Sequence, residues 1–538
     1  MATYNKTTVE IPDDEGVHTK TAGAKGEKYV YKYVKYFRNS EGKPRNKAKA
    51  IGKLDPATGK MFPNNYYFQL YNVNPELPEI SVWDYGYSYL ASKVCRDMGL
   101  LDCLTETFGD GAMDIIVMAS YMIREGNAMD GIDDWQQRNY FPDCRRLLDS
   151  KSTSKIFASI TAAQTNGFFT NWVKTAMSGG AVCYDVTSVS SYAQGMTTVE
   201  RGYNRDGDDL AQYNLGMFCD EANRMPVYYN RYNGSLTDKA NLSHVLANAR
   251  AVGIGRVKMV FDGGFWDGGS FGDIAAMCES FFVGMPMHLK ESQKMLEGHG
   301  GGVMKYANEL DSTHVYCVSA GMEISGVPGR AFLYFDSWNG LHLCGELSEH
   351  INRLKAELSA TKRYPKSKLC RYTPYFIITK HANGNGFDYA VDVDKVEKAR
   401  KSKGFFMIFS TDAESTPENV LAQYRAKDAV EKLFAQIKCD MDGGRIRTHN
   451  ERTTDGKTFV TFIACVIRSY MLNKLSKYLL HNSTSLKKVF NQLSNIIIVS
   501  SSNGFRFTKA LSKKQKDIIK CFEDVEGIFR DLNDVCLR

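Results

Sequence analysis

The chain of 538 residues lacks the features that mark membrane, secreted and zinc-stabilised proteins. It contains no run of 18 apolar residues, and its longest apolar stretches, such as residues 495–500, have the length of a strand. The N-terminal sequence MATYNKTTVEIPDDEG has no apolar core, so no secretory signal peptide is expected there. Its 13 cysteines form no CxxC pair, which argues against a disulfide scaffold and against structural zinc. We therefore expect a cytoplasmic protein with no membrane partner.

The composition that is present fits an ordinary globular protein of several domains. Hydrophobic residues make up 43% and charged residues 24% of the chain. A chain of this length exceeds what one hydrophobic core usually serves, so about three to five domains are expected. No internal repeat and no long low-complexity tract is visible.

Positive charge is concentrated near the N-terminus. Residues 20–60 hold twelve Lys and Arg but only three acids, an excess of nine charges in a chain whose net charge is +7. Residues 28–37, KYVYKYVKYF, have the period of a strand, and KAKAIGKL after the turn SEGKPRNK predicts a return strand. A basic two-stranded ribbon suits a DNA groove, although an ordinary exposed hairpin has the same pattern. The expected DNA contacts are Lys32, Lys35, Arg45, Lys47 and Lys49.

The order of elements predicts a multidomain α/β protein. From residue 179, three strand-like runs, a helix and a further strand follow one another, which is the opening order of an RNase H-like sheet. Many short strand candidates then interrupt that core before buried strands resume near residue 405. The expected divisions are a basic N-terminal DNA-binding region (1–75), a helical DNA-binding or dimerisation domain (76–178), the first core part (179–288), a β-rich insertion (289–400), the second core part with a catalytic Glu helix (401–475) and a C-terminal helical region (476–538).

One helical stretch, LAQYRAKDAVEKLFAQIK at residues 421–438, carries an unusual surface. At 100° per residue, an α-helix would place Tyr424, Lys427, Glu431 and Lys438 within about a 60° arc, opposite a broad apolar side. An acid flanked by two cations and a phenol is the arrangement expected where a carboxylate holds a metal ion while its neighbours hold phosphates.

Two aspartates stand at the ends of apolar runs. Asp185 follows AVCY, and Asp262 ends VKMVF. Taken singly, such a residue is most often a cap or turn residue. Together, carboxylates at the ends of strands in one sheet can converge, and Glu431 would join them from the helix. Three hard oxygen donors suit two Mg²⁺ ions, with Mn²⁺ as a substitute, and such ions can activate a water or a DNA 3′-OH.

At these positions the chain resembles a known family. The spacing Tyr424-x2-Lys427-x3-Glu431-x6-Lys438 is similar to the YREK signature (Tyr, two residues, Arg, three, Glu, six, Lys) of cut-and-paste DDE transposases from bacterial insertion sequences. Lys427 replaces the family's Arg, which keeps the charge but loses the bidentate fork. The segments YDVTS (184–188) and VFDGGF resemble the family's first- and second-Asp blocks. The block between them matches at Gln212, Pro226, Gly234 and Asp238, and KPRNKAKAIGKLDPATG resembles family N-termini.

The resemblance implies a DNA transposase with an RNase H-like core split by an insertion. Asp185, Asp262 and Glu431 would hold two Mg²⁺, cleave the inverted-repeat ends of the element and join the freed 3′-OH ends to target DNA. Tyr424, Lys427 and Lys438 would clamp the end phosphates. A homodimer that holds two ends is expected, acting at the bacterial nucleoid.

Further DNA contacts are expected outside the signature. The basic segment after the signature helix contributes Arg445, Arg447 and Arg452. Trp266 and Trp338 are the candidates for stacking on a flipped base, although a structural role is favoured for each because no motif fixes them. Two alternative functions stay open: a catalytically inactive DNA-binding regulator with this fold, and an RNase H-like nuclease that cuts without joining.

Overall fold

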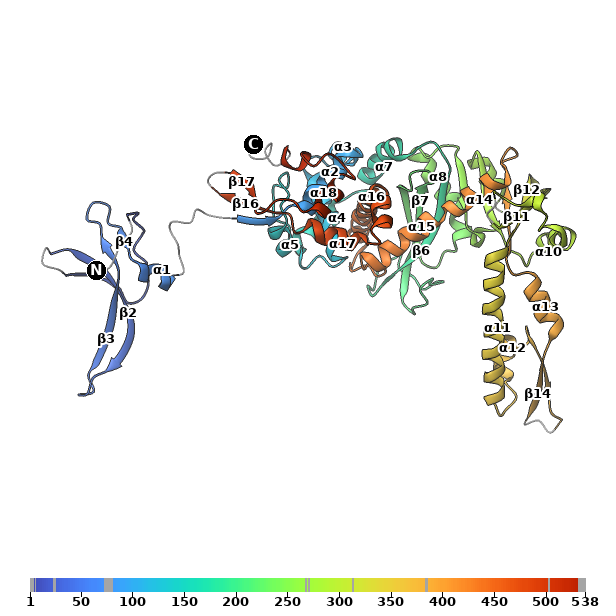
Figure 1. Cartoon of the computed structure of the whole chain (residues 1–538), viewed down its shortest axis with the longest axis horizontal. Coiled ribbons are helices and arrows are strands. Elements are labelled where there is room, and N and C mark those ends of the chain that lie inside the picture. Colours follow the sequence, from blue (N-terminus) through green and yellow to red (C-terminus); the bar gives the residue numbers. More distant parts are fainter. Residues whose placement is uncertain are drawn as a thin grey trace. The chain divides into compact units, whose positions relative to one another are not determined.

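The chain divides into two units (Figure 1). Unit 1 contains residues 1–82, 498–508 and 536–538, and unit 2 contains residues 83–497 and 509–535. The structure, a computed structural model, describes residues 4, 6–22, 26–71, 81–266, 269, 271–311, 314–382, 386–501 and 504–530. The domain boundary expected at residue 75 lies outside the described residues.

Unit 1 contains a small antiparallel sheet in the order β1-β2-β3-β4. Val30, Ile51 and Met61 point inward from this sheet and pack with Tyr67 of a short helix. The elements are β1 (Val17–Thr21), β2 (Lys28–Arg38), β3 (Pro44–Leu54), β4 (Met61–Pro63) and α1 (Asn65–Tyr71). Separately, β16 (Ile497–Ser501) pairs with both β17 (Gly504–Phe507) and β5 (Ser81–Asp84).

Helices form the first part of unit 2. They are α2 (Gly86–Asp97), α3 (Leu100–Phe108), α4 (Ala112–Glu125), α5 (Ile132–Arg138), α6 (Ser150–Ser159) and α7 (Ala162–Ala176). The late helix α16 (Glu451–His481) packs against α4 and α6 and is mostly buried from Thr454 to Met471. The boundary expected at 475/476 falls inside α16, which continues to His481, although its last buried residue is Leu475. The chain then forms α17 (Leu486–Leu493) and α18 (Lys513–Ile519).

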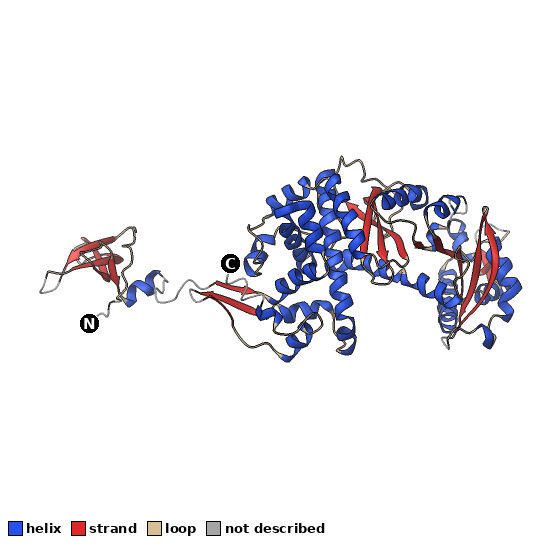
Figure 2. Ribbon diagram, turned by 90° about the horizontal axis from the view of Figure 1, so that it is seen from above, coloured by secondary structure: helices blue, strands red, loops and turns tan. Residues whose placement is uncertain are grey.

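The described part of unit 2 is organised by one eight-stranded mixed sheet, in the order β11-β12-β15-β10-β9-β6-β7-β8. β7 runs antiparallel to its neighbours β6 and β8, whereas β9 and β10 run parallel to β6. Figure 2 shows helices packed beside these strands. The elements are β6 (Val182–Ser191), β7 (Ala211–Asp220), β8 (Pro226–Asn233), α8 (Asp238–Ala251), β9 (Lys258–Phe261), α9 (Phe271–Met277) and β10 (Ser280–Met285).

The segment 289–400, expected to be β-rich, is mixed. Its longest element is a helix of 24 residues, α11 (Ser337–Ala360), and β12 leads directly into it. The strand periodicity was correct locally, but β11 and β12 extend the main sheet through β15 instead of forming a separate β body. The elements are α10 (Lys290–His299), β11 (Val315–Ile324), β12 (Val327–Asp336), α11, α12 (Leu369–Tyr372), β13 (Phe376–Lys380), β14 (Phe387–Val391) and α13 (Val393–Lys401). β15 (Phe405–Ser410) follows.

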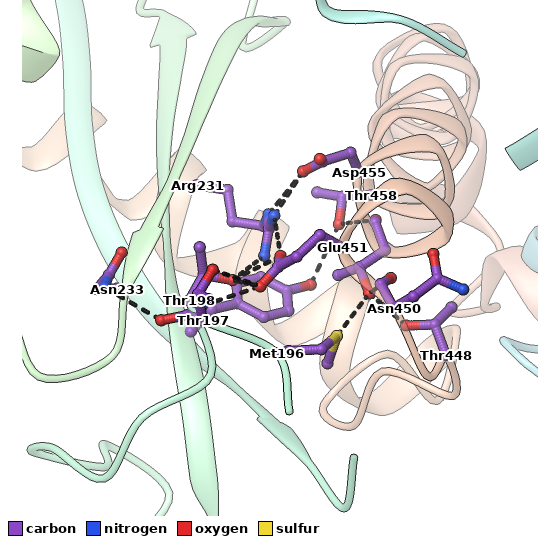
Figure 3. Close-up of polar contacts among 12 residues, drawn as sticks. Met196, Thr197, Thr198, Arg231, Asn233, Thr448, Asn450, Glu451, Asp455 and Thr458 are labelled. Carbon is purple, nitrogen blue, oxygen red and sulfur yellow. Dashed lines mark hydrogen bonds and ion pairs between the residues drawn. The ribbon is translucent and has the colours of Figure 1, made fainter. Parts of the chain in front are cut away.

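A polar network joins β8 to the start of α16 (Figure 3). The guanidinium of Arg231, only 8% exposed, donates to Glu451 at 2.8 Å and to Asp455 at 2.6 Å. Glu451 also accepts from the backbone amide of Thr198 at 2.9 Å. Burial raises the pKa of Glu451, but the Thr198 amide and Arg231 outweigh it and hold that pKa at about 2. These bonds fix the start of α16 to β8, at the edge of the sheet.

Candidate active site

Parallel pairing of β6 and β9 brings Asp185 and Asp262 together. Tyr184 lies opposite Phe261 in the register, so the next residue on each strand is one of the two aspartates. Burial raises the pKa of Asp185 to about 6. The amide of Val186, 2.8 Å away, opposes this rise, and the negative charge of Asp262 adds to it. Two neighbouring carboxyl groups, one of them largely buried, form a site that would favour a bound cation.

A helix pair brings three residues of the signature to the same place. α14 (Pro417–Ala426) carries Tyr424, α15 (Asp428–Ala435) carries Glu431, and Lys427 lies between the two helices. The Lys427 ammonium lies 2.7 Å from Asp262 and 2.6 Å from Glu431, so it bridges the two carboxylates. The Tyr424 hydroxyl donates to the same oxygen of Asp262 at 3.4 Å.

The approach of Tyr424 depends on a glycine. A Cβ at Gly284 of β10 would overlap the Tyr424 hydroxyl and lie 3.1 Å from the ring carbon that bears it. Only a residue without a side chain therefore lets the phenol pass between β10 and Asp262. Burial and the nearby Asp262 charge raise the pKa of Tyr424 to about 12, so the phenol stays protonated and can donate.

Lys427 sets the charge state of the group. Burial raises the pKa of Asp262, but the hydrogen bond and positive charge of Lys427 outweigh burial and lower that pKa below its usual range. Burial lowers the pKa of Lys427, but its bonds to Asp262 and Glu431 prevail and raise it. Asp262 is thus ionised and Lys427 charged at neutral pH.

The expected continuous helix over 421–438 is wrong in two respects, the first being the break at Lys427 between α14 and α15. A π-helix, Gln436–Asp440, follows α15 and changes the direction of Lys438. Lys438 ion-pairs with Asp206, 2.6 Å from both carboxylate oxygens, and forms no hydrogen bond or ion pair with Asp262 or Glu431 among the described residues. The 60° arc drawn for a regular helix therefore does not describe this fourth signature residue.

The fit of these residues to divalent cations can be judged from the donor set. Among the residues that the structure describes, no three His, Cys, Asp or Glu side chains form a group that could hold a metal ion. Lys427 separates Glu431 from Asp262 instead. The donor types still fit: three carboxylates supply hard oxygen, and a cation would relieve the buried Asp185–Asp262 pair. Metal binding would require Lys427 to leave its bridging position.

The basic segment after the signature helix adjoins β6. Ser190 of β6 exchanges backbone hydrogen bonds with Gly444 and Ile446, at 3.0 Å each. The guanidinium of Arg445 lies over the Tyr192 ring, 4.2 Å from its centroid, and Arg447 ion-pairs with Asp442 at 2.5 Å. Arg452, in the first turn of α16, is exposed.

The two tryptophans have different surroundings. Trp266 packs edge-on against Phe271 and Phe409 at centroid distances of 5.0 and 6.1 Å, as a structural residue would. Trp338, in the first turn of α11, is 70% exposed and stacks on His314 at 4.3 Å. Of these two tryptophans, Trp338 is the one with a large exposed ring surface.

One contact near the carboxylates escaped the sequence analysis. Arg205 ion-pairs with Asp238 and donates to Ser188 at 3.3 Å, and its charge helps to lower the pKa of Asp185. Arg205 lies in the acidic loop 203–209, so its local sequence gave no signal. The position of Asp238, noted for its resemblance to the family, was the available clue.

The N-terminal ribbon has one basic face. Lys32 lies directly opposite Lys49 and Lys35 opposite Lys47 in the register of β2 and β3. Directly opposite residues point to the same face, and like charges so placed repel each other. Lys32 also ion-pairs with Asp14 at 3.2 Å, whereas Lys35 and Lys47 make no ion pair with another described residue. Arg45 joins the same face, opposite Phe37.

A β-bulge produces this arrangement. Lys32 and Lys35 are three residues apart, which in a regular strand would place them on opposite faces. The register shifts between Tyr33 and Lys35, so Val34 is an extra residue that returns Lys35 to the face of Lys32. The other face carries tyrosines: Tyr31 and Tyr33 pack against His18, and Tyr36 packs against Tyr33.

Comparisons with known proteins leave the family open. No protein-family model matches the chain, and no curated protein matches it. One solved structure that it resembles is the piggyBac transposase synaptic complex with hairpin DNA, at 10% identity and a TM-score of 0.33, over 84% of this chain and 76% of that one. No described helix combines the length and the apolar character needed to cross a bilayer.

Proposed function

We propose that the chain is a DNA transposase of the DDE kind. The observation that carries the proposal is the meeting of Asp185 and Asp262 on adjacent parallel strands, with Glu431 linked to Asp262 through Lys427. Glu431 and Lys427 belong to the YREK-like spacing, and the two aspartates end the apolar runs of their strands. The strand order, with three antiparallel strands, α8 and then β9 parallel to β6, supports an RNase H-like core.

In this proposal the carboxylates bind metal, and Tyr424 and Lys427 bind phosphate. Asp185, Asp262 and Glu431 would hold two Mg²⁺, which when bound supply activation of a water or 3′-OH and stabilisation of the leaving oxygen. Tyr424 would donate its hydroxyl proton in a hydrogen bond to a phosphate oxygen. Lys427, released from the carboxylates, would place its charge on the same phosphate as a point charge without a fork.

DNA outside the cleavage point would be held by basic surfaces. Arg445 lies in the segment that pairs with Ser190 of β6, Arg447 and Arg452 follow it in the chain, and Lys438 would be available once it parts from Asp206. The basic face of the N-terminal ribbon would follow a phosphate backbone. Trp338 is the better candidate for stacking on an extruded base.

A second candidate function is a regulator that binds DNA without cutting it. The observation in its favour is the Lys427 bridge, which occupies the space between Asp262 and Glu431 with a built-in cation. A nuclease without joining activity needs the same carboxylates as a transposase, so the site geometry does not separate those two.

One experiment distinguishes the three functions. The full chain is incubated with Mg²⁺, a plasmid and labelled duplexes taken from the inverted termini that flank its reading frame. Joined products support the transposase, cut products without joining support the nuclease, and a mobility shift without cutting supports the regulator.

A matched pair of variants tests the site assignment. Glu431→Gln should abolish cutting and joining while DNA binding persists, because only the carboxylate charge is lost. Lys432→Gln, one residue along and paired with Asp428 on the exposed side, should keep full activity. Cutting by the Glu431→Gln protein at the wild-type rate would contradict the assignment.

A further inference from the structure

The segment after β12 forms an arm with a core of its own (Figure 1). Leu347, Ile351, Leu354 and Leu358 recur along one side of α11 at the spacing of a helix stripe. They pack with aromatic and aliphatic residues from the elements that follow: Tyr372, Phe376, Ile378, Phe387, Tyr389, Val391, Val396 and Ala399. The arm is therefore a packed unit that can hold its far end in a defined position.

The far end of the arm is strongly basic. Residues 361–380 contain six Lys and Arg and no Asp or Glu. Arg371 pairs with Glu357 at 3.1 Å, and Lys380 lies over the Tyr364 ring. The remaining four are exposed and form no ion pair with another described residue: Lys362, Arg363, Lys366 and Lys368. We call these four the tip cations.

The base of the arm is connected to the helix that carries the signature. Asp336 is the N-cap of α11, and Arg425 of α14 lies 3.7 Å from its carboxylate. Arg425 is the neighbour of Tyr424 in the sequence. Since α11 has 24 residues, at 1.5 Å each it carries the tip about 36 Å from this base, close to one helical turn of DNA.

We infer that the tip cations bind the phosphate backbone of duplex DNA, away from the point of cleavage. The inference rests on the proposed function in that it takes DNA as the substrate. Four unpaired cations within seven residues repel one another, and the phosphate charges of a polyanion relieve this repulsion. The counterions that the polyanion releases on binding add a favourable entropy. Flexible Lys side chains on a turn make phosphate contacts without reading base sequence, so the tip adds affinity independent of sequence.

The test neutralises the tip in the full chain. The variant Lys362→Gln/Arg363→Gln/Lys366→Gln/Lys368→Gln is compared with Lys474→Gln/Lys477→Gln/Lys487→Gln/Lys488→Gln, which removes the same charge from exposed positions of α16 and α17. Binding to a labelled 40-base-pair duplex of unrelated sequence is followed by fluorescence anisotropy over a series of NaCl concentrations. Circular dichroism confirms that each protein is folded.

The tip variant should lose about tenfold or more in affinity near 0.15 M salt, and its slope of log K against log salt should fall by up to about 3.6. The control variant should keep nearly the wild-type slope. Equal slopes for both variants would overturn the inference. Absence of DNA binding by the wild-type chain would instead contradict the proposed function, so the two failures are distinct.

Footprinting identifies which duplex the tip holds. Loss of protection about one turn from the cleavage point on an end duplex would place the tip on the same DNA. An unchanged footprint with reduced capture of added plasmid would place it on a second duplex. Both results support phosphate binding, and an unchanged footprint with unchanged capture contradicts it.

Discussion

At the scale of single residues, Lys427 decides the character of the site. Its ammonium lies between two carboxylates that the proposed reaction needs for metal. A cation of the protein and a cation from solution therefore compete for the same oxygens. Before metal and DNA bind, the ammonium charge offsets the repulsion between the two carboxylates and lets them stay close together.

Replacing Lys427 should separate metal binding from catalysis. Lys427→Met should bind Mn²⁺ about tenfold more tightly without DNA, a difference of about 1.4 kcal/mol, because the competing charge is gone. The same variant should lose DNA cleavage if the ammonium later contacts the phosphate. Isothermal titration measures the first effect, and Lys432→Met serves as the control. Unchanged or weaker Mn²⁺ binding would refute the competition.

A second residue-scale prediction concerns Gly284. Gly284→Ala should destabilise the fold by about 1–3 kcal/mol through overpacking and should displace the Tyr424 phenol from Asp262. In the double variant with Tyr424→Phe, part of that cost should disappear because the overlapping hydroxyl is absent. Urea denaturation of the four proteins in this cycle measures the coupling. Strict additivity would show that the two residues do not interfere.

At the scale of elements, the register of β2 and β3 places the basic residues on one face. Exchanging the neighbours Lys35 with Tyr36 and Asn46 with Lys47 moves both lysines of one opposed pair to the tyrosine face. Composition and net charge stay the same. Affinity for duplex DNA should fall about tenfold and the salt slope by about 2. Anisotropy titrations check this, and an unchanged slope would mean that the ribbon face makes no DNA contact.

The link between β8 and α16 predicts a dependence on pH. The pKa of Glu451 is lowered to about 2 in the folded chain, so the paired carboxylate stabilises the fold above the unfolded pKa near 4.3, and this contribution is lost as the pH falls towards 2. Glu451→Gln should therefore be less stable than wild type by about 2 kcal/mol at pH 7. The gap should narrow between about pH 4.5 and 2 in urea denaturation, and a gap independent of pH would contradict the pairing.

At the scale of the whole molecule, the proposed reaction requires two DNA ends in one assembly. With end DNA, light scattering after size exclusion should give a protein mass of twice the 60.5 kDa of one chain. A complex with one chain per duplex at all concentrations would contradict the dimer. This prediction rests on the symmetry of the reaction, and the ribbon and the arm tip are the surfaces that could hold DNA in each protomer.

Sequence patterns predicted much of the local structure. Period-2 alternation located β2 and β3, and the apolar runs before Asp185 and Asp262 located β6 and β9. The patterns did not predict α11, because its apolar stripe is narrow and follows directly on a strand. They also missed the Val34 bulge and the π-helix at 436–440. Each changes which way the following side chains point, but neither alters the polar and apolar pattern from which the element was predicted.

The sequence by itself determined which residues are candidates for the proposed chemistry: three acids at the ends of strands or on a helix, the signature cations and the basic segments. Residue type and spacing are enough for this, because charge and strand or helix period are local properties. Only the tertiary structure decided which of them meet. The parallel pairing of β6 with β9 brings together Asp185 and Asp262, and a lysine bridges Asp262 to Glu431. Contacts between residues far apart in the chain depend on register and packing, which no local pattern records.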